Sequence, residues 1–254
     1  SPQVAQCGGL ALFAPRVAMD LGQDASANRQ VSCESMCTLS SDVTELVAFD
    51  GCEELLRGVK LARILRSRGL IFGDSDGTAS TYLLSERVSR IGVFISHNWA
   101  VRRILKFVAL SYYFSFELGA LLMLPFVLAL GAASAFGLLP VVDTPSGYPV
   151  GISCRIVCNP CFLVLMFFGR NVLAWCGYEG PSVFLDKACI DQESAASKQR
   201  GIAKLGAFLA ASDHILVLYT DIYLTKLWTV YEVAAFLTNR EISSMTVVPV
   251  HHAV

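Results

Sequence analysis

The sequence predicts an α/β protein with a parallel sheet, into which two membrane-spanning helices are inserted. Strand and helix patterns alternate from residue 182 to residue 250, which is typical of a parallel sheet with right-handed crossovers. A run of 25 residues without a charge, 118–142, exceeds the roughly 20 apolar residues that a membrane span needs. Charged residues make up only 16% of the chain, against roughly 25% in an ordinary soluble domain, which indicates membrane segments or an unusually large core.

The first 90 residues are predicted to contain a flexible segment and a basic helix. Residues 1–50 are rich in small and polar side chains without a sustained period, which indicates a flexible N-terminal segment. Residues 52–68, CEELLRGVKLARILRSR, repeat apolar residues at helical spacing with Arg and Lys between them. We therefore expect a basic amphipathic helix, which could dock on a domain or lie on an anionic membrane surface.

The segment IFGDSDGTAS, 71–80, contains Asp74 and Asp76 in a D-x-D-G-T arrangement. It resembles the loop of haloacid-dehalogenase phosphatases, in which the first Asp is the nucleophile. That loop follows a buried strand, whereas only three apolar residues precede Gly73 here. We prefer the interpretation of a polar turn.

Cysteine spacing and net charge argue against a metal centre and a nucleic-acid partner. The nine cysteines are irregularly spaced, and only Cys158 and Cys161 form a C-x-x-C pair. A zinc site would need a second pair or histidines at matching spacing, and the sequence has neither. The net charge of −1 gives no general attraction to phosphate backbones. We predict no metal site and no binding of nucleic acid.

A short apolar run, Ile91 to Ile95, predicts a buried strand that ends at Ser96, His97 and Asn98. Open α/β sheets bind their ligands at the carboxyl ends of such strands. These polar residues are therefore expected at a ligand-binding edge.

Two apolar stretches predict a transmembrane hairpin. The first covers 118–142, and the second covers about 156–176 but contains Arg170, which would have to face an interface or a partner such as Glu117. Basic residues flank the pair, and the loop between the stretches carries a single acidic residue. The positive-inside rule then places both flanks, and both termini, in the cytoplasm. The alternative is a pair of buried core helices in a soluble protein.

The remaining residues alternate between strands and helices again. The strand that begins at residue 182 ends at Asp186, which would lie at the same carboxyl edge as His97. The other expected elements are a helix at 201–212, a strand at 214–220, a helix at 224–241 and a strand at 245–250.

Four stretches resemble, in order, the Toll/interleukin-1 receptor (TIR) domain. VFISHNW resembles the first strand of that family, VFLDK the second, GIAKLGAFLAASDHILVLYTDIYLTKLWTVYEVAAF the next helix–strand–helix portion, and TVVPV the following strand. FLDKACIDQ also resembles a stretch of heterokaryon-incompatibility domains. The resemblance implies a flavodoxin-like parallel sheet of TIR type.

The chain departs from the family in three ways. About 80 residues, including the predicted hairpin, separate the first two strands, where the family has one helix. Thr229 replaces the usual Cys after the Trp, and nothing after 250 corresponds to the last helix–strand–helix portion. We therefore expect a sheet that is incomplete at the C-terminus.

The resemblance implies a membrane-anchored signalling module that acts through homotypic or partner contacts. A first alternative is a nucleosidase that cleaves the bond between nicotinamide and ribose in NAD, with Glu232 of the W-x-x-x-E pattern as catalytic candidate. A fixed carboxylate favours the positive charge that develops on the ribose. Ser96, His97, Asp186 and Trp228 are the candidate ligand-binding residues. A second alternative is a small-solute transporter or channel.

The predicted organisation has five parts. They are a flexible segment (1–50), a basic helix and linker (51–90), the first part of the TIR-like domain (91–106), the hairpin insertion (107–181) and the second part of the domain (182–254). The expected partners are membrane lipid and other proteins, including a second copy of the chain. NAD would be a substrate, and no cofactor is expected.

Overall fold

The computed structural model describes residues 48–49 and 51–250. The chain separates into two units, Ser1–Ser41 and Asp42–Val254, and every described residue belongs to the second. The flexible segment that was predicted for 1–50 therefore lies almost entirely outside the described residues.

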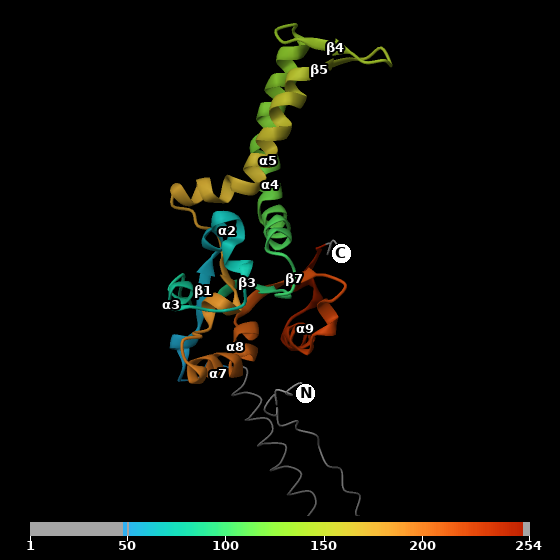
Figure 1. Cartoon of the computed structure of the whole chain (residues 1–254). Coiled ribbons are helices and arrows are strands. Elements are labelled where there is room, and N and C mark those ends of the chain that lie inside the picture. Colours follow the sequence, from blue (N-terminus) through green and yellow to red (C-terminus); the bar gives the residue numbers. More distant parts are fainter. Residues whose placement is uncertain (1–47, 50, 251–254) are drawn as a thin grey trace, which may run out of the picture. The chain divides into compact units, whose positions relative to one another are not determined.

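The described residues form a six-stranded mixed sheet with helices, so the predicted α/β class is confirmed. The strand order is β2-β1-β6-β3-β7-β8 (Figure 1). The strands are β1 (Arg57–Lys60), β2 (Ser85–Arg87), β3 (Ile91–Ser96), β6 (Ser182–Phe184), β7 (Ser212–Tyr219) and β8 (Met245–Pro249). β3 pairs in parallel with β6 and β7, and β7 with β8, whereas β1 runs antiparallel to both β2 and β6.

The four parallel strands follow the flavodoxin-like order. From β6 across the sheet to β8 they are the second, first, third and fourth of their set along the chain. Among the described residues, β8 forms one edge of the sheet, and the antiparallel pair β1–β2 extends the other. The parallel part therefore has the four strands that the sequence predicts, and the two antiparallel strands are additional.

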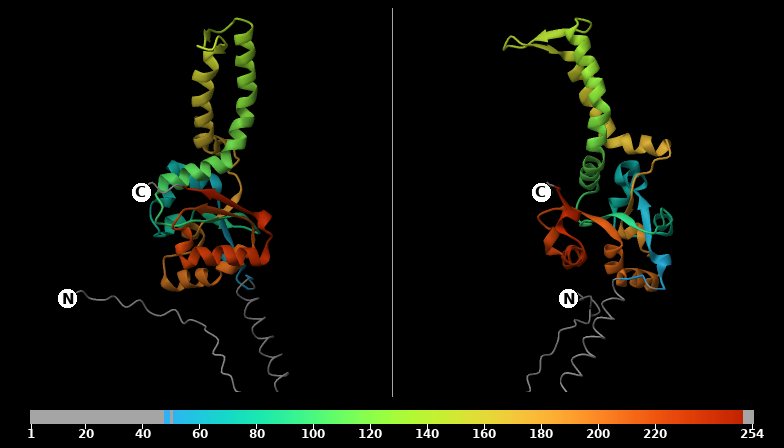
Figure 2. Two further views of the ribbon diagram at one scale, coloured as in Figure 1. Left: turned by 90° about the vertical axis from the view of Figure 1, so that its right-hand side faces the viewer. Right: turned by 180° about the vertical axis from the view of Figure 1, so that it is seen from behind.

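Helices cover both faces of the sheet (Figures 1 and 2). One face carries α2 (Leu61–Gly69) and the first turns of α4 (Arg103–Ala135). The other carries α7 (Ala195–Ala203), α8 (Leu205–Ala210) and α9 (Leu227–Asn239). Aromatic packing fixes the centre, where the rings of Phe94 and Phe184 stack with centroids 4.5 Å apart. The core therefore lies between the central strands and both helix layers.

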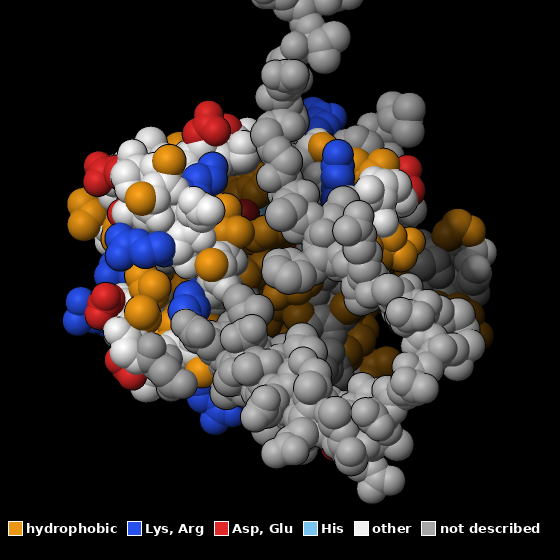
Figure 3. Space-filling model, turned by 90° about the horizontal axis from the view of Figure 1, so that it is seen from below, with side chains coloured by type: hydrophobic (Ala, Val, Ile, Leu, Met, Phe, Trp, Pro, Cys, Tyr) orange, Lys and Arg blue, Asp and Glu red, His pale blue; other side chains and the backbone are white. Residues whose placement is uncertain are grey.

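Short helical turns connect these elements. They are η1 (Glu53–Leu55), η2 (Leu70–Gly73), α3 (Ala79–Tyr82), α6 (Asp186–Cys189), η3 (Tyr223–Thr225) and η4 (Ile242–Ser244). Seen from the side of α7 and α8, the surface shows charged side chains of both signs around apolar ones (Figure 3).

The helices α4 and α5 (Ile152–Trp175) form a long hairpin between β3 and β6 of the chain. They pack against each other, and the ribbon of β4 (Val141–Asp143) and β5 (Pro149–Gly151) joins their far ends (Figure 2). Both are long and apolar enough to cross a membrane. Only 11% and 17% of their most apolar windows are buried, so these windows do not lie in the core of the described unit. Arg170 donates a hydrogen bond to the backbone carbonyl of Phe114 on α4, rather than pairing with Glu117.

The prediction of a single helix over 52–68 is wrong for the first half of that segment. Residues 53–55 form η1 and residues 57–60 form β1, so the helix α2 begins only at Leu61. Val59 pairs with Ser85 on β2 and with Val183 on β6. This pairing places Val59 in the core with no exposed area, so burial in the sheet overrides the helical spacing of the sequence.

Candidate functional site

A cleft of about 400 Å³ lies at the carboxyl ends of three parallel strands. His97, Asn98 and Trp99 follow β3 directly, Asp186 follows β6, and Trp228 lies on the helix that follows β7. In the sheet, β3 lies between β6 and β7. The chain therefore passes from β3 to its neighbour on one side, β6, and then to its neighbour on the other side, β7. The cleft therefore occupies the switch point, where open α/β sheets bind their ligands.

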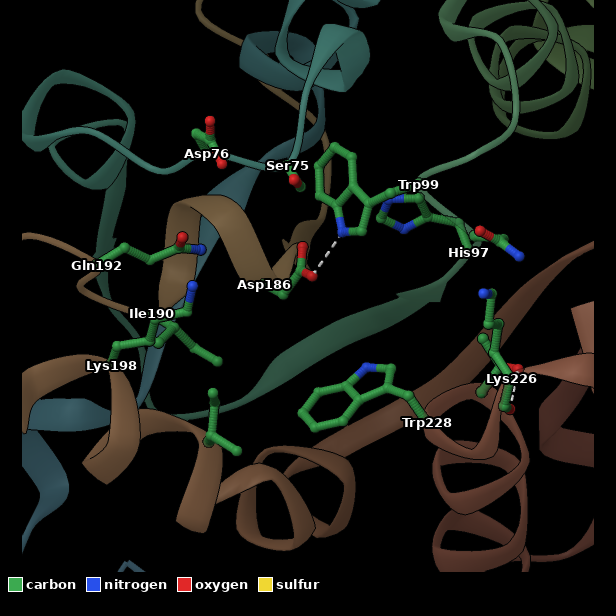
Figure 4. A pocket seen from close by; sticks show the side chains of 13 residues that line it. Ser75, Asp76, His97, Trp99, Asp186, Ile190, Gln192, Lys198, Lys226 and Trp228 are labelled. Carbon is green, nitrogen blue, oxygen red and sulfur yellow. Dashed lines mark hydrogen bonds between the residues drawn. The ribbon is translucent and has the colours of Figure 1, made fainter. Parts of the chain in front are cut away.

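Two indole rings and a carboxylate define the interior of the cleft. Figure 4 shows Trp99 and Trp228 on opposite sides, with Asp186 between them. The Nε1–H group of Trp99 donates a hydrogen bond of 2.9 Å to Oδ2 of Asp186, which fixes both side chains. The face of an indole can stack against a flat ring of a ligand.

Basic and polar side chains line the rim. Lys198 on α7 and Lys226 before α9 are both exposed and border the cleft. Figure 4 shows Gln192, Asp76 and Lys198 on one side of the cleft and Lys226 on the other. Two ammonium groups at the mouth of a cleft with a flat-ring site can bind an anionic part of the same ligand.

Asp186 is one of two carboxylates that line the cleft, the other being Asp76, and burial raises the pKa of Asp186 above the usual range. The hydrogen bonds from Trp99 and from the backbone N–H of Lys187 act in the opposite direction. A bound cation would favour the ionised form further, because an opposite charge lowers a carboxyl pKa.

Glu232 is buried next to the cleft and is not among the residues that line it. Its carboxylate accepts a hydrogen bond from the hydroxyl of Ser96, whose oxygen also lies 2.5 Å from the hydroxyl of Tyr223. Burial raises the pKa of Glu232 to about 8, with a further contribution from the charge of Asp186. In the unliganded protein Glu232 is therefore largely protonated at neutral pH.

A buried lysine lies behind Trp99. Lys106, on the first turns of α4, has no exposed area, and its Nζ lies 4.8 Å from the centre of the Trp99 ring and 5.7 Å from that of Phe72. Burial and this neighbouring charge lower the pKa of His97 to about 3, so His97 is neutral. Its ring packs edge-on against Trp99 at 4.5 Å. The indole of Trp99 is therefore held by contacts with Lys106, His97 and Asp186.

The structure brings the five predicted site residues into one region. His97, Asp186 and Trp228 line the cleft, whereas Ser96 and Glu232 form the buried hydrogen-bonded pair beside it. The assignment of Glu232 as the catalytic residue remains a prediction.

Sequence reasoning missed other residues of the site. Trp99 could have been found, because it follows the polar end of β3 directly. Lys106 and Lys198 carry no such signal, because the packing of α4 brings Lys106 to the ring of Trp99 and the packing of α7 brings Lys198 to the cleft.

The D-x-D-G-T segment forms a turn after helical structure, as preferred from the sequence. The backbone N–H of Asp76 donates to Oδ1 of Asp74 at 3.1 Å, and Nζ of Lys187 lies 2.5 Å from the same atom. The charge and hydrogen bond of Lys187 lower the pKa of Asp74. No group of three or more His, Cys, Asp or Glu within residues 48–49 and 51–250 is placed to hold a metal ion.

No protein-family model, curated protein or solved structure matches the chain. Its function therefore has to be argued from the chemistry of the cleft and the hairpin.

Proposed function

We propose that the chain is a membrane-anchored module of TIR type that binds NAD in its cleft and cleaves the bond between nicotinamide and ribose. The observation that carries the proposal is the pair of indoles with Asp186 between them at the switch point of the sheet. A volume of about 400 Å³ lies within the range of cofactor and small-molecule sites.

Each part of a dinucleotide has a counterpart in the cleft. A flat base can stack between Trp99 and Trp228, because stacking on indoles needs no particular base edge. The pyrophosphate carries negative charge that the ammonium groups of Lys198 and Lys226 complement. The Asp186 carboxylate can accept hydrogen bonds from ribose hydroxyls. These three contacts would hold the glycosidic bond at the carboxylate.

The reaction needs a carboxylate where positive charge develops. The bond between the ribose carbon and the nicotinamide nitrogen breaks with its electron pair going to nicotinamide. Water then adds to the ribose carbon and loses a proton, which gives ADP-ribose. A fixed anion stabilises the oxocarbenium-like transition state. Of the two carboxylates that line the cleft, we assign this role to Asp186, because it lies between the two indoles (Figure 4), and Glu232 would assist from the buried side once ionised.

Nicotinamide release from NAD by the full chain in lipid nanodiscs tests the proposal. Release is expected from the wild type, and Asp186→Asn is expected to lower the rate at least about 100-fold, the range for loss of one electrostatic group. Glu241→Gln, at an exposed position before η4, is the matched control and should keep the wild-type rate. Absence of release by the wild type at high protein density would refute the proposal.

We also propose that α4 and α5 cross the membrane, with the sheet unit and both termini in the cytoplasm. The low burial of both helices and the basic residues Arg102 and Arg103 at the start of α4 support this orientation. In sealed vesicles with the cytoplasmic face outward, protease should degrade the sheet unit and spare the β4–β5 ribbon. Cleavage within 143–151 in intact vesicles would contradict the topology.

A second candidate function is signalling through self-association, and the exposed apolar stripe of α9 favours it. Leu227, Val230, Tyr231 and Leu237 are 79%, 39%, 47% and 36% exposed, and their spacing places them along one side of the helix. Such a surface can pack against the same helix of a second chain. Leu237→Asp should lower cross-linking between copies and leave nicotinamide release by isolated copies unchanged. Equal cross-linking by variant and wild type would exclude this surface.

A further inference from the structure

A second cavity, of about 380 Å³, lies at the base of the hairpin between α2 and the end of α5. Arg63 and Arg66 of α2 line one side, and Asn171 and Trp175 of α5 line the other. Glu179, just after α5, completes the wall. Neither the nucleotide cleft nor the α9 stripe includes any of these residues.

One of the two arginines in this cavity is neutralised and the other is free to bind. The guanidinium of Arg63 donates to both carboxylate oxygens of Glu179, at 3.1 and 2.8 Å. It also lies 3.6 Å from the carboxylate of Glu86. Arg66 is exposed and has no hydrogen bond or ion pair with any described residue, and the same is true of Arg68. The cavity thus offers an uncompensated positive charge.

The backbone of α2 turns these two arginines out of the helix. Arg66 leaves the helical conformation with ψ of 144°. Ser67 and Arg68 then adopt positive φ angles of 52° and 57°. Left-handed conformations cost about 1–2 kcal/mol for residues other than glycine, so this geometry is maintained against a local preference. Arg66 lines the cavity, and Arg68, which does not line it, adds a second exposed charge at the end of α2.

The end of α5 adds an apolar stripe beside the cavity. Phe168, Val172 and Trp175 are 43%, 50% and 87% exposed, and their spacing of four and three residues places them on one side of the helix. Figures 1 and 2 show this last part of α5 turned away from the hairpin axis and lying across its base, above α2. Tryptophan is enriched at the membrane–water interface, because its ring is largely apolar and its N–H group can bind water.

We propose that this cavity binds the headgroup of an anionic phospholipid. The phosphate would bind the Arg66 guanidinium with the Asn171 amide beside it, because a planar guanidinium forms paired hydrogen bonds with phosphate oxygens. The exposed charge of Arg68 at the end of the same helix would add to the attraction. The stripe of Phe168, Val172 and Trp175 would face the acyl chains. A lipid is the occupant, rather than free phosphate, because Trp175 of this apolar stripe lines the cavity. Basic pockets at the cytoplasmic ends of membrane helices bind anionic headgroups, because the positive charge lies at the level of the lipid phosphates.

The proposal rests on the membrane insertion of α4 and α5, so the test measures insertion separately. The full chain is reconstituted in vesicles of phosphatidylcholine with one fifth phosphatidylglycerol, then extracted, and its bound lipid is counted by mass spectrometry. We expect phosphatidylglycerol to make up a fraction of the lipid retained by the wild type that is at least about twofold above its bulk fraction. The double variant Arg66→Gln, Arg68→Gln should lose this enrichment. The matched control Lys198→Gln, Arg200→Gln, on exposed α7, should keep it.

Resistance to carbonate extraction reports insertion in all three proteins. If all three are inserted and the Arg66, Arg68 variant keeps the enrichment, the lipid site is refuted while the membrane anchor stands. If the wild type is extracted by carbonate, the anchor itself fails. Equal competition by inorganic phosphate would show a simple anion site and overturn the assignment to lipid.

Discussion

Replacing the Glu232 carboxylate by an amide should stabilise the protein at neutral pH and remove part of its pH dependence. The pKa of Glu232 is about 8 in the folded protein against 4.5 for an ordinary glutamate, because the side chain is buried. The folded protein therefore binds one proton more than the unfolded chain between these two values. The contribution of Glu232 to the free energy of unfolding is fully present below pH 4.5 and is lost as the pH rises towards 8.

The expected magnitude follows from the size of this shift. Each pH unit within the window lowers the free energy of unfolding by about 1.4 kcal/mol. Between pH 6.5 and 8 the loss amounts to about 2 kcal/mol. His97, with a folded pKa of about 3 and an ordinary value of 6.5, contributes only below this range. Glutamine imitates the protonated acid, so Glu232→Gln should be more stable than the wild type by about 3 kcal/mol at pH 7.

Urea unfolding of the full chain in micelles, followed by circular dichroism at several pH values, measures both quantities. The wild type should lose stability from pH 6.5 to 8 more steeply than Glu232→Gln. Glu193→Gln, at an exposed position, should keep the wild-type slope. Parallel slopes for the wild type and Glu232→Gln, or lower stability of that variant at every pH, would refute the buried, proton-holding state of Glu232.

Two further predictions concern the packing around the cleft. Gly201→Ala should lower the free energy of unfolding by about 1–3 kcal/mol, because its new Cβ would lie 2.5 Å from Cγ2 of Ile190. Gly73→Ala meets no atom within 4 Å, so urea midpoints should separate the two variants, and equal midpoints would contradict the overpacking. Thr229→Val should cost about 1–3 kcal/mol, because the Thr229 hydroxyl is buried and donates to the carbonyls of Tyr223 and Lys226. An unchanged urea midpoint would show that those hydrogen bonds do not support the start of α9.

The parallel part of the sheet could be predicted because its strands are short apolar runs with polar ends. Residues 91–95 and 214–220 have this pattern. Strands that are buried on both faces of a sheet need apolar side chains at nearly every position. The strand β1 could not be found in the same way. Its four residues, RGVK, lie within a longer helical spacing, and only pairing with β2 and β6 makes them a strand. Local pattern and tertiary pairing compete there, and pairing prevails.

The cleft was predictable where the chain itself delivers residues to the sheet edge. Ser96, His97 and Asp186 follow from strand ends, and Trp228 from the family resemblance. The burial of Glu232 could not be predicted, because the helical spacing that places it near Trp228 does not fix which of the two faces the cleft. The place of Lys106 depends on how α4 packs over the sheet, which its own sequence does not specify.

Binding of NAD to the cleft is the most direct test of the account, because both the chemistry and the roles of the residues depend on it. Titration of the full chain in nanodiscs with a non-cleavable NAD analogue, followed by tryptophan fluorescence, should give saturable quenching. Trp228→Leu should abolish saturation, whereas Tyr148→Leu, exposed on the loop between β4 and β5, should keep it. Unchanged saturation in Trp228→Leu, or none in the wild type, would contradict a nucleotide site between the two indoles.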